Sequence, residues 1–296
     1  VNSTGSDLVD LTLYGPGSVS GSATIVAYAL SLSTNRVFIG GRTTLSGLPM
    51  TGSPFDNSFS SNDGFVAVFS RDLSTLHYST YLGSSGSEDL GVTSIRAQDD
   101  NSFICGLTAA GSLPASYISA GAAQTSFGGS QDMYIAKFSS LNTLSWGTYI
   151  GGSGNEIFND LELFGDGRVA FAGSGTGSLT EKNSAASRST GSDFDGILGV
   201  LNSGGTAFNY LDEVGGGQDD KINDLVIKGT SLFWTGIAGS GFPTASGAYD
   251  VSHNGGTDAI VGSVSEVGGS GSWRATYFGG SGNDLGSGIQ RVEQTK

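Results

Sequence analysis

Residues 273–288 read WRATYFGGSGNDLGSG, an aromatic run that ends in Tyr277-Phe278, followed by a glycine-rich turn and an Asn-Asp pair. The phrase returns at 78–91 as YSTYLGSSGSEDLG, at 146–157 as WGTYIGGSGNEI and, altered, at 210–222 as YLDEVGGGQDDKI, with a fainter copy, LTLYGPGS, at 11–18. The first glycines of these turns are spaced by 68, 68, 64 and 64 residues, at Gly15, Gly83, Gly151, Gly215 and Gly279. Such regular spacing identifies a repeat protein.

Four strand-like runs recur between successive turns. The first run of each repeat alternates apolar with small or polar residues, as in a strand with one buried face. The first runs lie at 24–29, 92–97, 160–164 and 224–228; the second at 36–41, 102–107, 168–173 and 232–237; the third at 63–69, 132–138, 195–201 and 258–264. The fourth is the aromatic run, as at 76–82. No segment has helical periodicity. Four strands per repeat predict an all-β fold, a β-propeller of four-stranded blades.

The predicted propeller is one domain over residues 1–296, with four complete repeats and a partial fifth blade. The repeat units span about 15–82, 83–150, 151–214 and 215–278, with the partial blade at 279–296. If the aromatic strand is innermost in its blade, the array holds four blades and half of a fifth. If it is outermost, Leu8 to Tyr14 is an unpaired outer strand and the C-terminal run an unpaired inner one. Either way, one blade lacks strands.

Composition narrows the class of partner. The chain has 13 basic and 27 acidic residues, a net charge of −14, which argues against nucleic acid and anionic membranes because a phosphate-binding face needs cations. No apolar stretch approaches the ~20 residues needed to span a bilayer, so we expect no membrane insertion. Little lysine and much Gly, Ser, Thr and Asn in a repeat array predict a secreted protein, extracellular or at the cell surface, whose export signal is absent from this chain.

Several phrases resemble the bacterial SBBP β-propeller repeat, in which a Tyr-Leu-Gly-Gly-Ser-Gly-Asp turn is joined to Phe-Pro-Thr, Gly-Gly and Asp-Ala-Phe-Val segments. They are YSTYLGSSGSEDLG, TYIGGSGNE, FPTASGAYDVSHNGGTDAIV and TYFGGSGNDLG. The resemblance covers nearly the whole chain, but it is faint in the third unit, where EVGGGQDD replaces the tyrosine turn and Phe-Pro is missing. It implies a propeller, usually extracellular or surface-associated. The family has no single activity, so the resemblance implies none.

An acidic residue follows the turn in every repeat, at Glu88, Glu156, Asp220 and Asp284. Carboxylates beside glycine-rich backbone could supply the hard oxygen ligands that Ca²⁺ requires. They could instead cap turn amides, as Asp and Asn commonly do. We favour the cap because no stretch has the full spacing of a calcium loop. The best calcium candidate is SDFDG (192–196), where Asp193 and Asp195 double the carboxylate.

Three further sets recur once per repeat and have structural explanations. Aspartates stand just before the third run, at Asp63, Asp132, Asp195 and Asp258, and a catalytic residue is seldom needed four times. Glycines interrupt the second run, at Gly40, Gly106, Gly173 and Gly236, which suggests close backbone approach. Phenylalanines in the same runs, at Phe38, Phe103, Phe171 and Phe233, are expected to be buried between blades.

Catalytic motifs are missing from the sequence, and we expect neither catalytic nor cofactor-binding residues apart from calcium. There are two histidines, His77 on an aromatic strand and His253 in a loop, and no G-x-S-x-G elbow. Cys105, the only cysteine, lies in apolar SFICGL and is expected to be buried and inert. No G-x-G-x-x-G precedes a helix.

The sequence therefore predicts a structural or interaction protein, a scaffold that binds other proteins or copies of itself through loops and strand edges. The exposed candidates are Asp7 to Tyr14 and Ser287 to Gln294. The alternatives are a five-bladed ring sealed by the chain's own termini and a fragment of a longer protein. A glycan-binding module is one alternative, with sugars stacking on Trp146, Trp234 or Trp273, although Trp234 is expected in the core. A glycosidase or lyase is another, if two repeated carboxylates face one channel about 5–10 Å apart.

Overall fold

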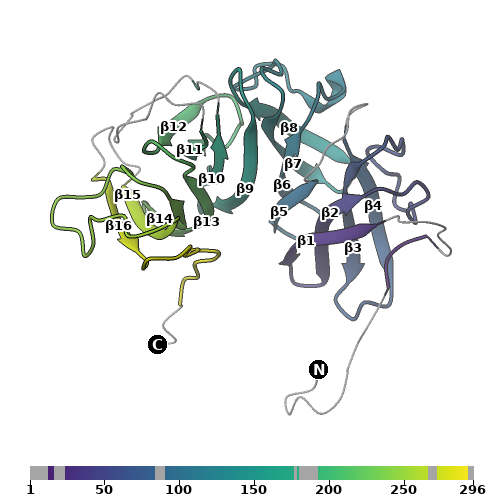
Figure 1. Cartoon of the computed structure of the whole chain (residues 1–296). Coiled ribbons are helices and arrows are strands. Elements are labelled where there is room, and N and C mark those ends of the chain that lie inside the picture. Colours follow the sequence, from purple (N-terminus) through teal and green to yellow (C-terminus); the bar gives the residue numbers. More distant parts are fainter. Residues whose placement is uncertain are drawn as a thin grey trace, which may run out of the picture. The chain divides into compact units, whose positions relative to one another are not determined.

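A computed structural model describes residues 13–16, 24–83, 91–176, 179, 193–265 and 272–292 of the protein. In this part of the chain, sixteen strands form four four-stranded antiparallel sheets, and each sheet contains its strands in chain order (Figure 1). The only helix among these residues is the short 3₁₀ turn η1 (Ala115–Tyr117), so no helix there is long and apolar enough to cross a membrane. The all-β class is confirmed.

Each sheet takes its strands from one repeat. Sheet one consists of β1 (Ile25–Leu32), β2 (Arg36–Thr43), β3 (Asp63–Ser70) and β4 (Leu76–Leu82). Sheet two consists of β5 (Val92–Ala97), β6 (Phe103–Ala109), β7 (Asp132–Ser140) and β8 (Thr143–Ile150). Sheet three consists of β9 (Glu156–Leu163), β10 (Val169–Gly175), β11 (Asp195–Leu201) and β12 (Phe208–Val214). Sheet four consists of β13 (Lys221–Lys228), β14 (Ser231–Ala238), β15 (Asp258–Ser265) and β16 (Arg274–Phe278). Each of the four repeated runs overlaps a strand in every sheet. The described part of the predicted partial blade, residues 279–292, contains no strand, and residues 8–12 of the N-terminal run lie outside the described residues.

The chain divides into two compact units, Val1–Ser119 with Ile135–Gly147, and Ala120–Tyr134 with Thr148–Lys296. In the first unit, β1 and β2 contact β5, and the rings of Phe38 and Phe103 lie 5.8 Å apart. In the second unit, β13 contacts β9, β10 and β11 over one apolar core that includes Leu198 and Trp234. In both units a sheet meets the next one through its first strand, and the aromatic fourth strand forms the opposite edge. The single-domain assignment stays a prediction.

A glycine allows close backbone approach where the second strand meets an irregularity in the first. A Cβ added to Gly173 or Gly236 would collide with a carbonyl oxygen of the first strand, at Ile157 and Lys221 respectively. In sheet one the equivalent residue is Gly41, which faces the carbonyl of Val26, and not Gly40 as the sequence suggested. Gly40 instead lies against the side chain of Val92, at the contact between β2 and β5.

Burial of the phenylalanines is confirmed at Phe38, Phe103 and Phe171, which are fully buried, but it is wrong at Phe233, which is half-buried. In β14 the neighbouring Trp234 points into the core opposite Gly262, so alternation places Phe233 on the other face. Phe38 and Phe233 hold matching places, opposite Val68 and Ser263. The face bearing Phe38 is covered by β5, whereas the face bearing Phe233 is partly open.

Candidate functional site

The repeated acidic residues of the turns bond to the turn backbone. Glu156, Asp220 and Asp284 each accept a hydrogen bond from the glycine amide four residues earlier, at 2.8, 2.5 and 2.8 Å. These glycines are Gly152, Gly216 and Gly280, again 64 residues apart. Asp220 also accepts the amide of Gly239 at 2.8 Å. The three described turn carboxylates are therefore caps that hold the glycine-rich turn closed, the role expected of all four. The fourth, Glu88, lies outside the described residues.

The second repeated set is an aspartate that begins the third strand in all four sheets. All four side chains are buried: Asp63, Asp132, Asp195 and Asp258. Asp63 accepts the amide of Ser60 at 2.8 Å, and Asp258 accepts that of Asn254 at 2.9 Å. Asp132 accepts two amides, from Gly128 and Gly129. These residues fasten the preceding loop to the strand, which agrees with the structural role predicted for them.

The two acidic sets meet at the turn, which the sequence analysis did not anticipate. A Cβ added to Gly279 would lie 2.7 Å from Oδ1 of Asp258 and 2.9 Å from Oδ2 of Asp284. Gly215 is wedged in the same way between Asp195 and Asp220. Each such turn thus places two carboxylates around a glycine that must lack a side chain. The partners are 25 or 26 residues apart in sequence, a nearly constant offset that could have suggested the pairing.

Burial changes the acidity of these groups. The pKa of Asp220 is raised to about 7, chiefly because burial removes water from the charged form, with smaller contributions from Asp195 and Asp193. The amides of Gly216 and Gly239 oppose this rise. Burial likewise raises the pKa of Asp63 to about 6 and raises that of Asp132. Where desolvation exceeds amide bonding, the neutral carboxyl is favoured in the folded protein.

Calcium binding by these turns stays a prediction. Among the described residues, no three His, Cys, Asp or Glu side chains are grouped so as to hold a metal ion. Around Gly215 the candidates Asp193, Asp195 and Asp220 are close enough for the first two to raise the pKa of the third. Backbone carbonyl oxygens would have to complete any calcium site there.

Replacing Asp284 by alanine should separate the capping role from the metal role. Loss of the charged bond to the Gly280 amide is expected to cost about 1–2 kcal/mol of unfolding free energy. Asp284→Asn, which keeps an acceptor oxygen, should retain most of the melting temperature, and so should Leu285→Ala at the exposed neighbour. Differential scanning fluorimetry with and without EDTA is the measurement. A fall in the wild-type melting temperature with EDTA that is absent in Asp284→Ala would establish calcium instead.

A buried tyrosine ties the aromatic strand to the long loop. Tyr277 donates to the carbonyl of Gly239 at 2.7 Å and accepts the amide of Phe242 at 3.0 Å, in the Phe-Pro segment. Tyr81 makes the same pair of bonds, to Leu45 and Leu48 of the Leu-Pro segment. This explains why the aromatic turn and the proline segment occur together in a repeat.

The third repeat lacks both features and uses a carboxylate in their place. Glu213 stands at the tyrosine position, is fully buried, and accepts the amide of Leu179 at 2.9 Å. Its neighbour Asp212, also fully buried, accepts the hydroxyl of Tyr210 at 3.0 Å. Sequence analysis registered the loss of the motif in EVGGGQDD but not this replacement, because a buried carboxylate is unexpected on an aromatic strand.

The remaining candidate side chains are packed into the fold. His253 bonds to the carbonyl oxygen of Gly256 at 2.9 Å, and His77 is half-buried on β4. Trp146 and Trp234 are buried and so are not presented for stacking on a sugar. Trp273 is half-buried and donates its indole N–H to the carbonyl of Pro243 at 3.0 Å. Cys105 is buried as expected, and burial raises the pKa of its thiol.

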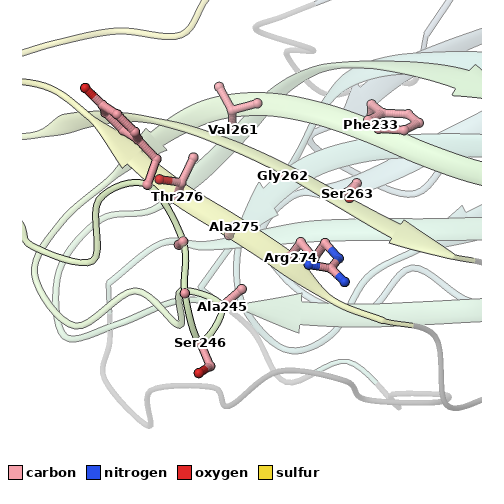
Figure 2. Close-up of a pocket in the computed structure, with 12 residues that line it drawn as sticks. Phe233, Ala245, Ser246, Val261, Gly262, Ser263, Arg274, Ala275 and Thr276 are labelled. Carbon is pink, nitrogen blue, oxygen red and sulfur yellow. The ribbon is translucent and has the colours of Figure 1, made fainter.

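The outer face of sheet four, meaning the face that bears Phe233, Val261 and Arg274, contains a pocket of about 310 Å³. Figure 2 shows these side chains on β14, β15 and β16, with Ala245 and Ser246 contributed by the loop that precedes β15. The pocket lining is mainly apolar. Arg274 adds a cation to a chain whose net charge is −14.

Comparison with known proteins adds no assignment. No protein-family model matches the chain, and no curated protein matches it either. The resemblance to the SBBP repeat stays a prediction, and any function must be inferred from the sheets, turns and faces described above.

Proposed function

We propose that the protein is a propeller-type scaffold, secreted or held at the cell surface, which binds proteins, including further copies of itself, through the open end of its array of sheets. The observation that carries this proposal is a clamp that recurs at that end. It joins sheet three to sheet four, and then joins sheet four to the C-terminal run.

The clamp consists of an Asn-Asp pair on the first strand of a sheet. Asn159 donates to the carbonyl of Ile222 at 2.7 Å, and Asp160 accepts the amide of Leu225 at 3.3 Å. These bonds fasten β13 beside β9. Because the side-chain groups bond to backbone, the clamp depends on strand position more than on the sequence that it holds.

The same clamp repeats 64 residues later. Asn223 donates to the carbonyl of Gly286 at 2.9 Å, and Asp224 accepts the amide of Ile289 at 2.8 Å. Gly286 also donates to the carbonyl of Gly236 at 3.1 Å. Residues 222–225 of β13 lie beside β9, and residues 286–289 lie beside β13 in the equivalent way. This is the place where a fifth sheet would begin. Residues 279–292 form no strand, so the clamp supports only the position of the inner run predicted there.

The arrangement supports a propeller in which the first strands lie innermost and the aromatic strands outermost, since sheets meet through their first strands in both units. It also favours binding over catalysis. The turn carboxylates have the same capping bonds in three repeats, as expected of structural parts. The described residues of sheet four add a partly open face and a clamped run, residues 286–289.

Sedimentation velocity over a wide range of protein concentration tests the proposal. We expect the weight-average sedimentation coefficient to rise with concentration, because an open face and a free strand edge favour association between copies. A chain that sediments as a monomer at every concentration would contradict self-assembly.

A further inference from the structure

We propose that the outer face of sheet four is a docking surface for a second copy of this chain, which presents its N-terminal Leu13–Tyr14 segment and sheet one. This inference rests on the proposed scaffold function and names the surfaces that meet. It follows from comparing equivalent positions in sheets one, three and four.

The exposed fraction of one side chain shows whether this face is covered in a given sheet. The side chain is that of the residue three places after the initial aspartate of the third strand. It is Val66 in sheet one, Leu198 in sheet three and Val261 in sheet four, paired with Gly40, Ala172 and Thr235 respectively. Val66 and Leu198 are 0% exposed, whereas Val261 is 42% exposed. In sheets one and three, the next sheet packs against this face. In sheet four, the described part of the C-terminal run bonds to Asn223 and Asp224 of β13 and to Gly236 of β14.

The uncovered part of the face remains suited to packing. Phe233 and Val261 supply apolar area, and the pocket of about 310 Å³ is of a size to accept a large side chain (Figure 2). Towards the outer edge, Ser263 and Arg274 replace the Val68 and Tyr78 of sheet one. The face is thus less apolar than its buried equivalents, which fits reversible association better than a permanent core.

The matching surface lies at the other end of the same chain. Tyr14 packs on sheet one, with its ring 5.4 Å from that of Phe65 and its hydroxyl 2.5 Å from that of Ser79. Its neighbour Leu13 stands two residues before the turn glycine Gly15, where three of the other four turns have a tyrosine, at Tyr81, Tyr149 and Tyr277. Those tyrosines are buried, and Leu13 is 92% exposed.

The repeated architecture indicates which molecule binds to the outer face of sheet four. In sheets one and three, the partner of this face is another sheet of this same sequence, so a copy of the chain is the complementary surface already present in solution. Among the described residues, Val261 on the receiving face is 42% exposed and Leu13 is 92% exposed. Such different but complementary patches join copies head to tail. The Arg274 cation also favours a partner as acidic as this chain.

Charge substitutions on the two surfaces test the inference by sedimentation velocity. Val261→Asp and Leu13→Asp should each abolish the concentration-dependent rise, because each buries an unpaired carboxylate at one side of the contact. Both sites are exposed in the single chain, so folding should be retained, as circular dichroism would verify. The control Val251→Asp, on an exposed loop residue outside the face, should associate like the wild type.

Mixing the two variants gives the sharper result. Each retains one intact surface, so an equimolar mixture should form dimers that do not grow further, whereas either variant alone remains monomeric. Wild-type association that Val261→Asp leaves unchanged would overturn this inference while the scaffold function stands. A wild-type chain that never associates would overturn both.

Discussion

Replacing Trp234 by alanine is expected to lower the free energy of unfolding by about 3–5 kcal/mol, the usual cost of deleting a large buried aromatic side chain. Trp234 is fully buried, with its ring 5.0 Å from that of Trp273 and 6.0 Å from that of Phe242. Gly262 lies opposite Trp234 and has no side chain that could fill the cavity left by the substitution. Urea unfolding, followed by fluorescence of the remaining tryptophans, measures the loss.

The matched control is the adjacent residue. Phe233→Ala should cost less than half as much when measured in dilute solution, because Phe233 is half-buried on the outer face of sheet four. Equal losses at the two positions would mean that the faces of β14 have been assigned wrongly. A loss below about 1 kcal/mol at Trp234 would contradict the packing of sheet three on sheet four.

Stability should fall as the pH rises from about 4 to about 7, owing mainly to Asp220. Its pKa is raised from 3.8 to about 7 in the folded protein, so in this interval the folded state holds a proton that the unfolded chain has released. The penalty is absent below the unfolded pKa and complete above the folded one. Since one pKa unit corresponds to about 1.4 kcal/mol, we expect a decline of about 2–4 kcal/mol. Asp63, whose pKa is about 6, acts in the same direction.

Urea unfolding at a series of pH values measures this decline, and substitution assigns it. Asp220→Asn should remove most of the dependence near pH 7, whatever its effect on absolute stability, because the side chain no longer titrates. Asp219→Asn, at the exposed neighbouring carboxylate, should leave the dependence intact. A stability that is flat or rising between pH 4 and 7 would contradict the burial described for Asp220.

The strands could be predicted from the sequence because their signals are local. The short apolar runs in DGFVAVF and DGILGVL can be recognised without tertiary information, and the initial aspartate marks the start of the third strand in all four sheets. Burial was harder to predict, since it depends on which sheet covers which face. Phe38 and Phe233 occupy matching places, but only the first has a neighbouring sheet over it.

The candidate site was predicted in its parts and not in its assembly. The turn carboxylates and the third-strand aspartates were each found as a repeated set, with capping favoured. Their meeting around Gly215 and Gly279 depends on a turn that returns the chain to the start of the preceding strand. The role of Glu213 at the tyrosine position could not be predicted either, because it also depends on a contact between segments distant in sequence. A carboxylate can replace a phenol only because both accept the same loop amide.

Cross-linking between copies decides whether the two ends of the array meet between molecules. Cys105, the only natural cysteine, is buried, so thiols introduced by Leu13→Cys and Val261→Cys can be linked selectively with a short bismaleimide. Mixing the two single variants should give cross-linked dimers that neither gives alone. If the double variant instead links only within one chain, and the mixture of single variants gives no dimer, the head-to-tail scaffold is contradicted.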